Sequence, residues 1–93
     1  MEIDDKPYAL IGVQNGLKII EVSDPSYPAI RGSLSFDGYS NGISTVEIRE
    51  KFYALIANGN EGLKIIDVSD PSNPKLVSSL DIFGHAHGII IME

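Results

Sequence analysis

Short runs of aliphatic and aromatic residues alternate with clusters of Gly, Asn, Asp, Ser and Pro along the chain. In the second half, "FYALIA" and "GLKIIDV" are bounded by "NGNEG" and "SDPSNP", and no hydrophobic pattern with the 3.6-residue period of a helix runs far enough to predict one. This texture is typical of β-strands joined by tight turns. Four strands are expected there, at residues 43–48, 52–57, 62–68 and 75–82.

The third and fourth of these strands differ in their patterns. The third is apolar on both alternate sets, with Leu63 and Ile65 on one and Ile66 and Val68 on the other. A strand covered by other sheets on both faces has this pattern. The fourth, "KLVSSLD", is more polar, which is typical of an outer edge strand.

The chain consists of two copies of one unit. "GLKIIEVSDPSYP" at 16–28 returns as "GLKIIDVSDPSNP" at 62–74, and the 46-residue offset falls to 45 upstream of Gly62, where a Gly/Asn loop takes the extra residue. Repeat 1 is therefore about 1–46 and repeat 2 about 47–93. Four strands in a unit of this length indicate a propeller blade, so we expect an all-β fold of two blades.

These motifs resemble the LVIVD repeat family, whose units run Gly-Leu, an aliphatic strand, Asp-Val-Ser-Asp-Pro, a second Pro, a Ser-Leu strand and Gly-x-Ala-x-Gly-Ile. Repeat 1 departs from this pattern, because Glu21 replaces the Asp at 67 and Ser40 the Ala at 86. The resemblance implies a β-propeller, often within bacterial or archaeal surface or exported proteins. It implies no defined substrate, cofactor or catalytic residue.

Two blades are too few for a closed propeller, which needs roughly four to eight. A 93-residue globule buries only about 60% of its unfolded surface, and without cysteine no disulfide can compensate. The sequence predicts head-to-tail self-association into a homotrimer or homotetramer, with strand 89–92 of one chain pairing with strand 8–12 of the next. The alternative is that these two blades are a piece of a longer propeller.

The charge balance bears on possible partners. A net charge of −6, with acidic residues scattered along the chain, disfavours nucleic acid. The N-terminal "MEIDDKPYAL" lacks the pattern of a signal peptide, and no apolar run reaches the roughly 20 residues of a membrane span. We therefore expect no membrane insertion, and the sequence predicts no compartment.

"GHAHG" is the one motif with chemical promise. In an extended segment, His85 and His87 point the same way, which suits two imidazoles on one divalent metal ion, with Asp81 or Glu61 as supporting partners. Repeat 1 has Tyr39 and Asn41 at these positions, so only alternate blades would carry the pair. The alternative interpretation is that small polar residues here satisfy backbone groups at a strand start.

No nucleophile, general-base pair or phosphate loop accompanies the histidines, so catalysis is not expected. The sequence favours a structural or protein-interaction propeller module. Such a module would bind a protein partner on its loop face through Tyr39, Asn41 and the "NGNEG" loop. The alternative function is a metal- or small-ligand-binding propeller, with or without enzymatic activity, whose axial site is built from His85 and His87. No other cofactor is predicted.

Overall fold

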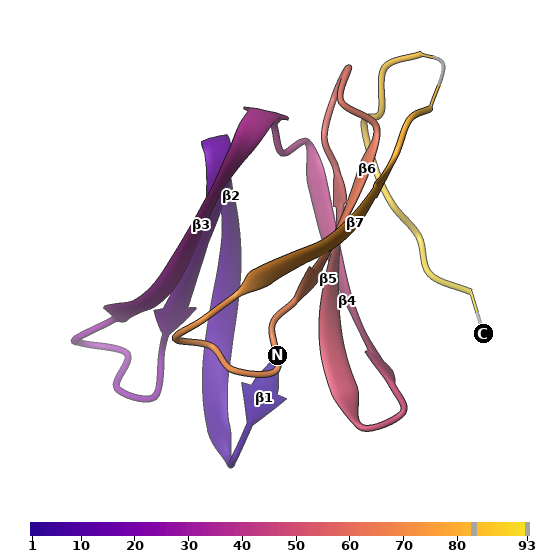
Figure 1. The fold of residues 1–93 in the computed structure, drawn as a ribbon. Coiled ribbons are helices and arrows are strands. Elements are labelled where there is room, and N and C mark those ends of the chain that lie inside the picture. The colour runs from indigo at the N-terminus through magenta and orange to yellow at the C-terminus, as the bar shows by residue number, and fades with distance from the viewer. Residues whose placement is uncertain (83, 93) are drawn as a thin grey trace.

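The computed structural model describes residues 1–82 and 84–92; Phe83 and Glu93, which the sequence assigns to repeat 2, lie outside the described residues. The fold is all-β, with two antiparallel sheets side by side (Figure 1). Sheet 1 has the order β1-β2-β3 and sheet 2 the order β4-β5-β6-β7. The strands are β1 (Glu2–Ile3), β2 (Lys6–Glu21), β3 (Ala29–Tyr39), β4 (Gly42–Ile48), β5 (Lys51–Ala57), β6 (Leu63–Asp67) and β7 (Lys75–Leu80).

Sheet 2 is the four-stranded unit that the sequence predicts at residues 43–82. We assign the whole sheet to repeat 2, although β4 begins a few residues before the boundary at about residue 46. Each strand begins and ends within two residues of its predicted bounds. Arg49 and Glu50 form the turn between β4 and β5 with φ of 52° and 67°. Two successive residues of positive φ match the right-handed twist of a tight hairpin, so β4 and β5 pair in register from end to end. All six residues of β7 are exposed, which confirms it as the outer strand.

Sheet 1 repeats this plan, although β2 spans what the sequence divides into two strands. The amide of Val22 donates to the carbonyl of Pro7 at 3.0 Å, so β2 doubles back on itself. The corresponding bond of repeat 2, from Val68 to Phe52, is 2.9 Å long. The second and third strands of repeat 1 are thus the two arms of β2, and β1 is a short piece of its first strand.

The two sheets bury their core between non-equivalent faces. We call the side carrying Tyr8, Leu10, Leu17 and Ile19 in repeat 1, and Tyr53, Leu55, Leu63 and Ile65 in repeat 2, the tyrosine face. The opposite side, carrying Ala9, Ile11, Ile20 and Val22 or Ala54, Ile56, Ile66 and Val68, is the alanine face. The core forms where the tyrosine face of repeat 1 packs on the alanine face of repeat 2.

The "SDP" segments of both repeats form the tight turns expected between strands. In repeat 2, Asp70 Oδ1 accepts from the Ser72 amide at 3.1 Å, and in repeat 1 Asp24 Oδ1 accepts from the Ser26 amide at 3.0 Å. Such Asx turns reverse the chain without a glycine. The repeat 2 turn also seats against sheet 1, because its Pro71 carbonyl lies where a side chain on Gly32 would stand.

Candidate functional site

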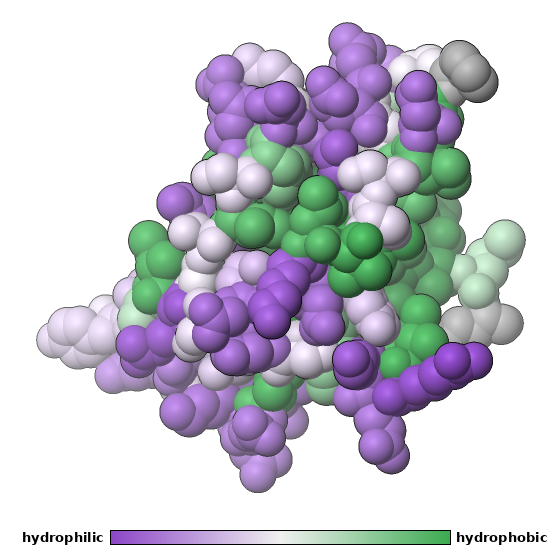
Figure 2. Space-filling model, in the orientation of Figure 1, coloured by the Kyte–Doolittle hydropathy of each residue, from purple (hydrophilic) through white to green (hydrophobic). Residues whose placement is uncertain are grey.

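Each repeat leaves open the face that the other repeat buries. On the open tyrosine face of repeat 2, Tyr53, Leu55 and Ile65 line a shallow apolar depression and are only half-buried. On the open alanine face of repeat 1, Ile11 is 47% exposed, whereas its counterpart Ile56 is fully buried. Hydrophobic side chains also gather over sheet 2, including its side away from sheet 1 (Figure 2).

The expectation that the third strand packs on both faces is correct for one face only. Ile66 and Val68 are fully buried against sheet 1, whereas Leu63 and Ile65 on the other side remain half-buried. The reason is that one chain supplies a covering sheet on one side alone. The apolar pattern of this strand therefore exceeds what the single chain buries.

Residues 84–92 lie beside β4, on the side of sheet 2 away from sheet 1 (Figure 1). The Ser44 hydroxyl donates to the Ile89 carbonyl at 3.4 Å, and the backbones of Gly42 and Gly88 approach closely. The segment lies where the first strand of a following blade would lie, but it forms no strand in the structure. An isolated β-bridge joins Ala86 to Gly59. Pairing of 89–92 with 8–12 of another chain remains a prediction.

The loops at one end of the sheets bring the two histidines together. The Ala86 amide donates to the Gly59 carbonyl at 3.1 Å, and Asn41 Nδ2 donates to the Ala86 carbonyl at 2.8 Å. These two bonds fix the backbone of Ala86. The rings of His85 and His87 on either side of it are exposed, and their centroids are 4.7 Å apart. His85 Nδ1 is hydrogen-bonded to Asn60 Oδ1.

The hydrogen-bond partner of His85 is therefore Asn60, whereas the sequence predicted Asp81 or Glu61 as the supporting residue. The only signal for Asn60 was its position in the inserted Gly/Asn loop of repeat 2. Of the residues proposed for a protein-binding loop face, Tyr39 is 60% exposed, and Asn41 is held by its bond to Ala86.

Asn58 ties the two sheets together at this end. Its side chain is fully buried, and Nδ2 donates to the Asp37 carbonyl at the end of β3 at 2.6 Å. Its Oδ1 has no hydrogen-bond partner among the described residues. The corresponding position in repeat 1 is Val13, so this link occurs in repeat 2 alone.

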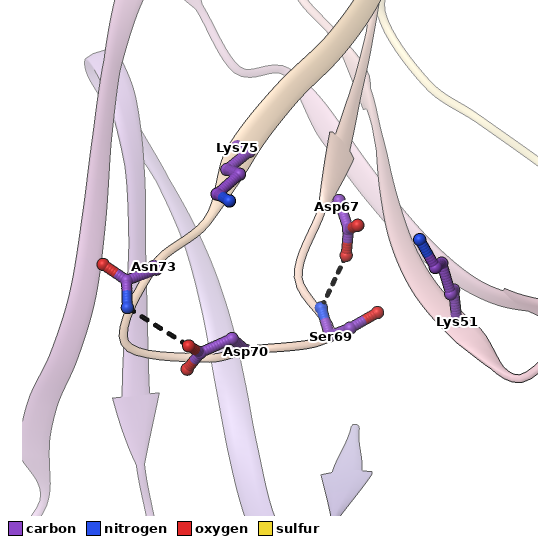
Figure 3. Close-up of a pocket in the computed structure, with 6 residues that line it drawn as sticks. All are labelled: Lys51, Asp67, Ser69, Asp70, Asn73 and Lys75. Carbon is purple, nitrogen blue, oxygen red and sulfur yellow. Dashed lines mark hydrogen bonds between the residues drawn. The ribbon is translucent and has the colours of Figure 1, made fainter.

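A polar pocket at the opposite end is built by the turn after β6 (Figure 3). Its lining residues are Lys51, Asp67, Ser69, Asp70, Asn73 and Lys75. Asp67 accepts from the Ser69 amide at 2.9 Å, and Asp70 accepts from Asn73 Nδ2 at 3.1 Å. Both carboxylates therefore stabilise the turn. The backbone hydrogen bond from Ser69 is the main cause that holds the pKa of Asp67 below its ordinary value.

The Ser69 hydroxyl is also engaged structurally, because it accepts from the Phe52 amide at 2.9 Å. No group of three or more His, Cys, Asp or Glu side chains in residues 1–82 and 84–92 is arranged to hold a metal ion. The described part of the chain contains no helix long and apolar enough to cross a membrane.

Comparison with known proteins gives one match. The model of the LVIVD repeat matches residues 7–35 and 42–82, one segment in each repeat. No curated protein and no solved structure matches the chain. The two matched segments cover most of the sequence, so the chain belongs to the LVIVD repeat family.

Proposed function

We propose that this chain is a two-blade propeller module whose function is structural, and that identical copies assemble head to tail into a closed ring. The open tyrosine face of repeat 2 would pack on the open alanine face of repeat 1 in the next copy. The observation that carries the proposal is the interface inside the chain, which already joins a tyrosine face, that of repeat 1, to an alanine face, that of repeat 2.

The residues on the open faces support this pairing. The buried alanine face of repeat 2 presents Ala54, Ile56, Ile66 and Val68, and the open one of repeat 1 presents Ala9, Ile11, Ile20 and Val22. The buried and open tyrosine faces match as closely. An intermolecular contact would thus repeat, nearly residue for residue, a contact that one chain forms by itself.

The two open faces are non-equivalent, because one is an alanine face and the other a tyrosine face. A contact that repeats the internal one must therefore join different faces of two copies, so a head-to-tail contact is favoured over a symmetric dimer. Heterologous contacts form a ring when their rotation closes and a filament when it does not. Three copies supply six blades and four copies eight, within the roughly four to eight blades of closed propellers. The homotrimer and the homotetramer are therefore the expected products.

The experiment combines light scattering after size exclusion with two surface variants. The wild-type chain of 10.1 kDa is expected at three or four times its mass. Ile11→Glu places a charge on the open alanine face, and Ile65→Glu places one on the open tyrosine face. Each variant alone is expected to be monomeric, because an unpaired charge cannot be buried in an apolar contact.

Mixing the two variants tests the head-to-tail arrangement directly. The Ile11→Glu chain retains an intact tyrosine face and the Ile65→Glu chain an intact alanine face, so the equimolar mixture should form a heterodimer and nothing larger. Ser26→Glu, in an exposed turn, is the control that should assemble like wild type. A wild-type chain that stays monomeric at high concentration overturns self-assembly, and variants that fail to complement overturn the head-to-tail arrangement.

A further inference from the structure

We propose that His85 and His87 bind one divalent transition-metal ion at the loop end of repeat 2, through one nitrogen of each ring. Zinc, nickel and copper are the ions that imidazole ligands suit. The site lies within one chain and goes beyond the structural role proposed above, so it does not depend on assembly.

The hydrogen bond of His85 fixes which nitrogen is free. An amide oxygen can only accept, so Asn60 Oδ1 requires the proton of His85 on Nδ1. The neutral ring then carries its lone pair on Nε2, directed away from Asn60. Metal-binding histidines typically donate their second ring nitrogen to an oxygen in this way, which fixes both tautomer and ring orientation.

The spacing of the rings fits a shared ion. With metal–nitrogen bonds of about 2.0–2.1 Å and an angle near tetrahedral, two imidazoles on one ion have ring centres roughly 5 Å apart. The centroids of His85 and His87 are 4.7 Å apart, with the ring planes tilted by 52°. Two stacked or diverging rings would not bring their nitrogens to one point, whereas tilted rings at this separation can.

The backbone holds this arrangement without the metal. Ala86, between the two histidines, has its amide bonded to Gly59 and its carbonyl bonded to Asn41. The loop that positions Ala86 also carries Asn60, so one element orients both the backbone and the His85 ring. Less conformational freedom is therefore lost when an ion binds than in a free His-x-His peptide.

Water or an added ligand would complete the coordination, since two imidazoles are the only side-chain ligands that the proposal requires. Such a site keeps open coordination positions, unlike the closed structural type of zinc site. The net charge of −6 favours a cation at the surface. Repeat 1 carries Tyr39 and Asn41 at the equivalent positions, so the expected stoichiometry is one ion per chain.

The test is equilibrium dialysis of the tag-free chain against Zn²⁺, with metal content measured per chain. Wild type should bind one ion. His85→Ala and His87→Ala should each weaken binding at least tenfold, and the double variant should bind none. With Cu²⁺ as the probe, the electron paramagnetic resonance spectrum of wild type should show two coordinated imidazole nitrogens.

Variants of Asn60 separate orientation from simple exposure of histidine. Asn60→Ala should weaken binding by about 10- to 100-fold, the usual effect of losing a supporting hydrogen bond. Asn60→Asp should restore it, because the carboxylate also accepts the Nδ1 proton. Asn73→Ala, at the opposite end of sheet 2, is the matched control and should bind as wild type does.

Two results would overturn the site: wild type binding no more Zn²⁺ than the double variant, or Asn60→Ala binding as tightly as wild type. Circular dichroism checks that the variants fold, which is expected because both rings are exposed. The Ile11→Glu monomer should retain its ion, so failure of assembly and failure of the metal site give different results.

Discussion

Repeat 1 buries its tyrosine face and leaves its alanine face open, whereas repeat 2 does the reverse. Ile19 and Ile65 occupy the same position of the repeat, yet Ile19 is fully buried and Ile65 half-buried. The residue is the same and only the neighbouring sheet differs. The burial of these residues therefore depends on whether a neighbouring sheet packs on their face, and not on the residue type.

In the strands the two repeats have the same residues but different neighbours, whereas in the loops the residues themselves differ. "VQNG" in repeat 1 corresponds to "NGNEG" in repeat 2, which is one residue longer, has Asn58 in place of Val13 and carries Asn60. Asn58 links the sheets and Asn60 orients His85. The shared strands thus define a common scaffold, and the differences that could confer function are concentrated at one end of it.

The largest expected effect comes from truncating the equivalent isoleucines. Ile19→Ala removes a fully buried side chain from the core and should lower the free energy of unfolding by about 2–5 kcal/mol. Ile65→Ala, measured in the monomeric Ile11→Glu background, should cost less than about 1.5 kcal/mol, because that side chain is half-exposed. Urea unfolding of each variant in that background measures both.

The same two variants, Ile19→Ala and Ile65→Ala, also test whether assembly covers the open tyrosine face of repeat 2. In the wild-type background, the cost of Ile65→Ala should rise with protein concentration toward that of Ile19→Ala, because the neighbouring copy covers the open face. Equal costs at every concentration would contradict this account of the two faces.

Much of the fold follows from local pattern. The strands of repeat 2 are correct to within two residues, because apolar runs and turn residues mark their ends. The tight turn expected at "SDPSNP" is also present, since the hydrogen bonds of Asp70 involve only neighbours in the sequence. The sequence could not tell which face of each sheet the single chain covers, because covered and open faces carry the same residues.

The candidate site was predicted only in part. The two-residue spacing of His85 and His87 correctly placed both rings on one side. The bond to Asn60 could not be predicted, because it joins residues 25 apart across an inserted loop. Glu61 and Asp81 were expected because carboxylates are common partners of histidine, but the loop conformation presents the amide instead.

A smaller effect is expected where repeat 1 accommodates the turn of repeat 2. Gly32→Ala would place a methyl group against the Pro71 carbonyl, so the turn must move, at a cost of about 1–3 kcal/mol. The equivalent residue in repeat 2 is Ser78, which is exposed in the single chain. Ser78→Ala should change the free energy of unfolding by less than about 0.5 kcal/mol. Thermal unfolding measures the loss of stability in each variant. An equal loss for Gly32→Ala and Ser78→Ala would mean that the turn at Pro71 moves aside without cost.

The smallest effect concerns the acidic residue that ends the third strand of each repeat. The Ser69 amide holds the pKa of Asp67 below its ordinary value of 3.8, so the carboxylate stabilises the folded state above that pH. This contribution is lost as the pH falls through the lowered pKa. Asp67→Asn should therefore cost less than about 1 kcal/mol at neutral pH, because the group is largely solvated, and nothing in strong acid.

The equivalent residue Glu21 has its pKa lowered mainly by its hydrogen bond to Arg31, at 2.9 Å. Arg31 is replaced by Val77 in repeat 2, so the two carboxylates should respond differently to salt. The effect of Glu21→Gln should fade in concentrated NaCl, because an exposed ion pair is screened, whereas that of Asp67→Asn should persist, because its partner is a neutral amide at hydrogen-bond distance. Urea unfolding at low and high salt measures both, and equal screening would show that the Asp67 contribution comes instead from Lys51 and Lys75.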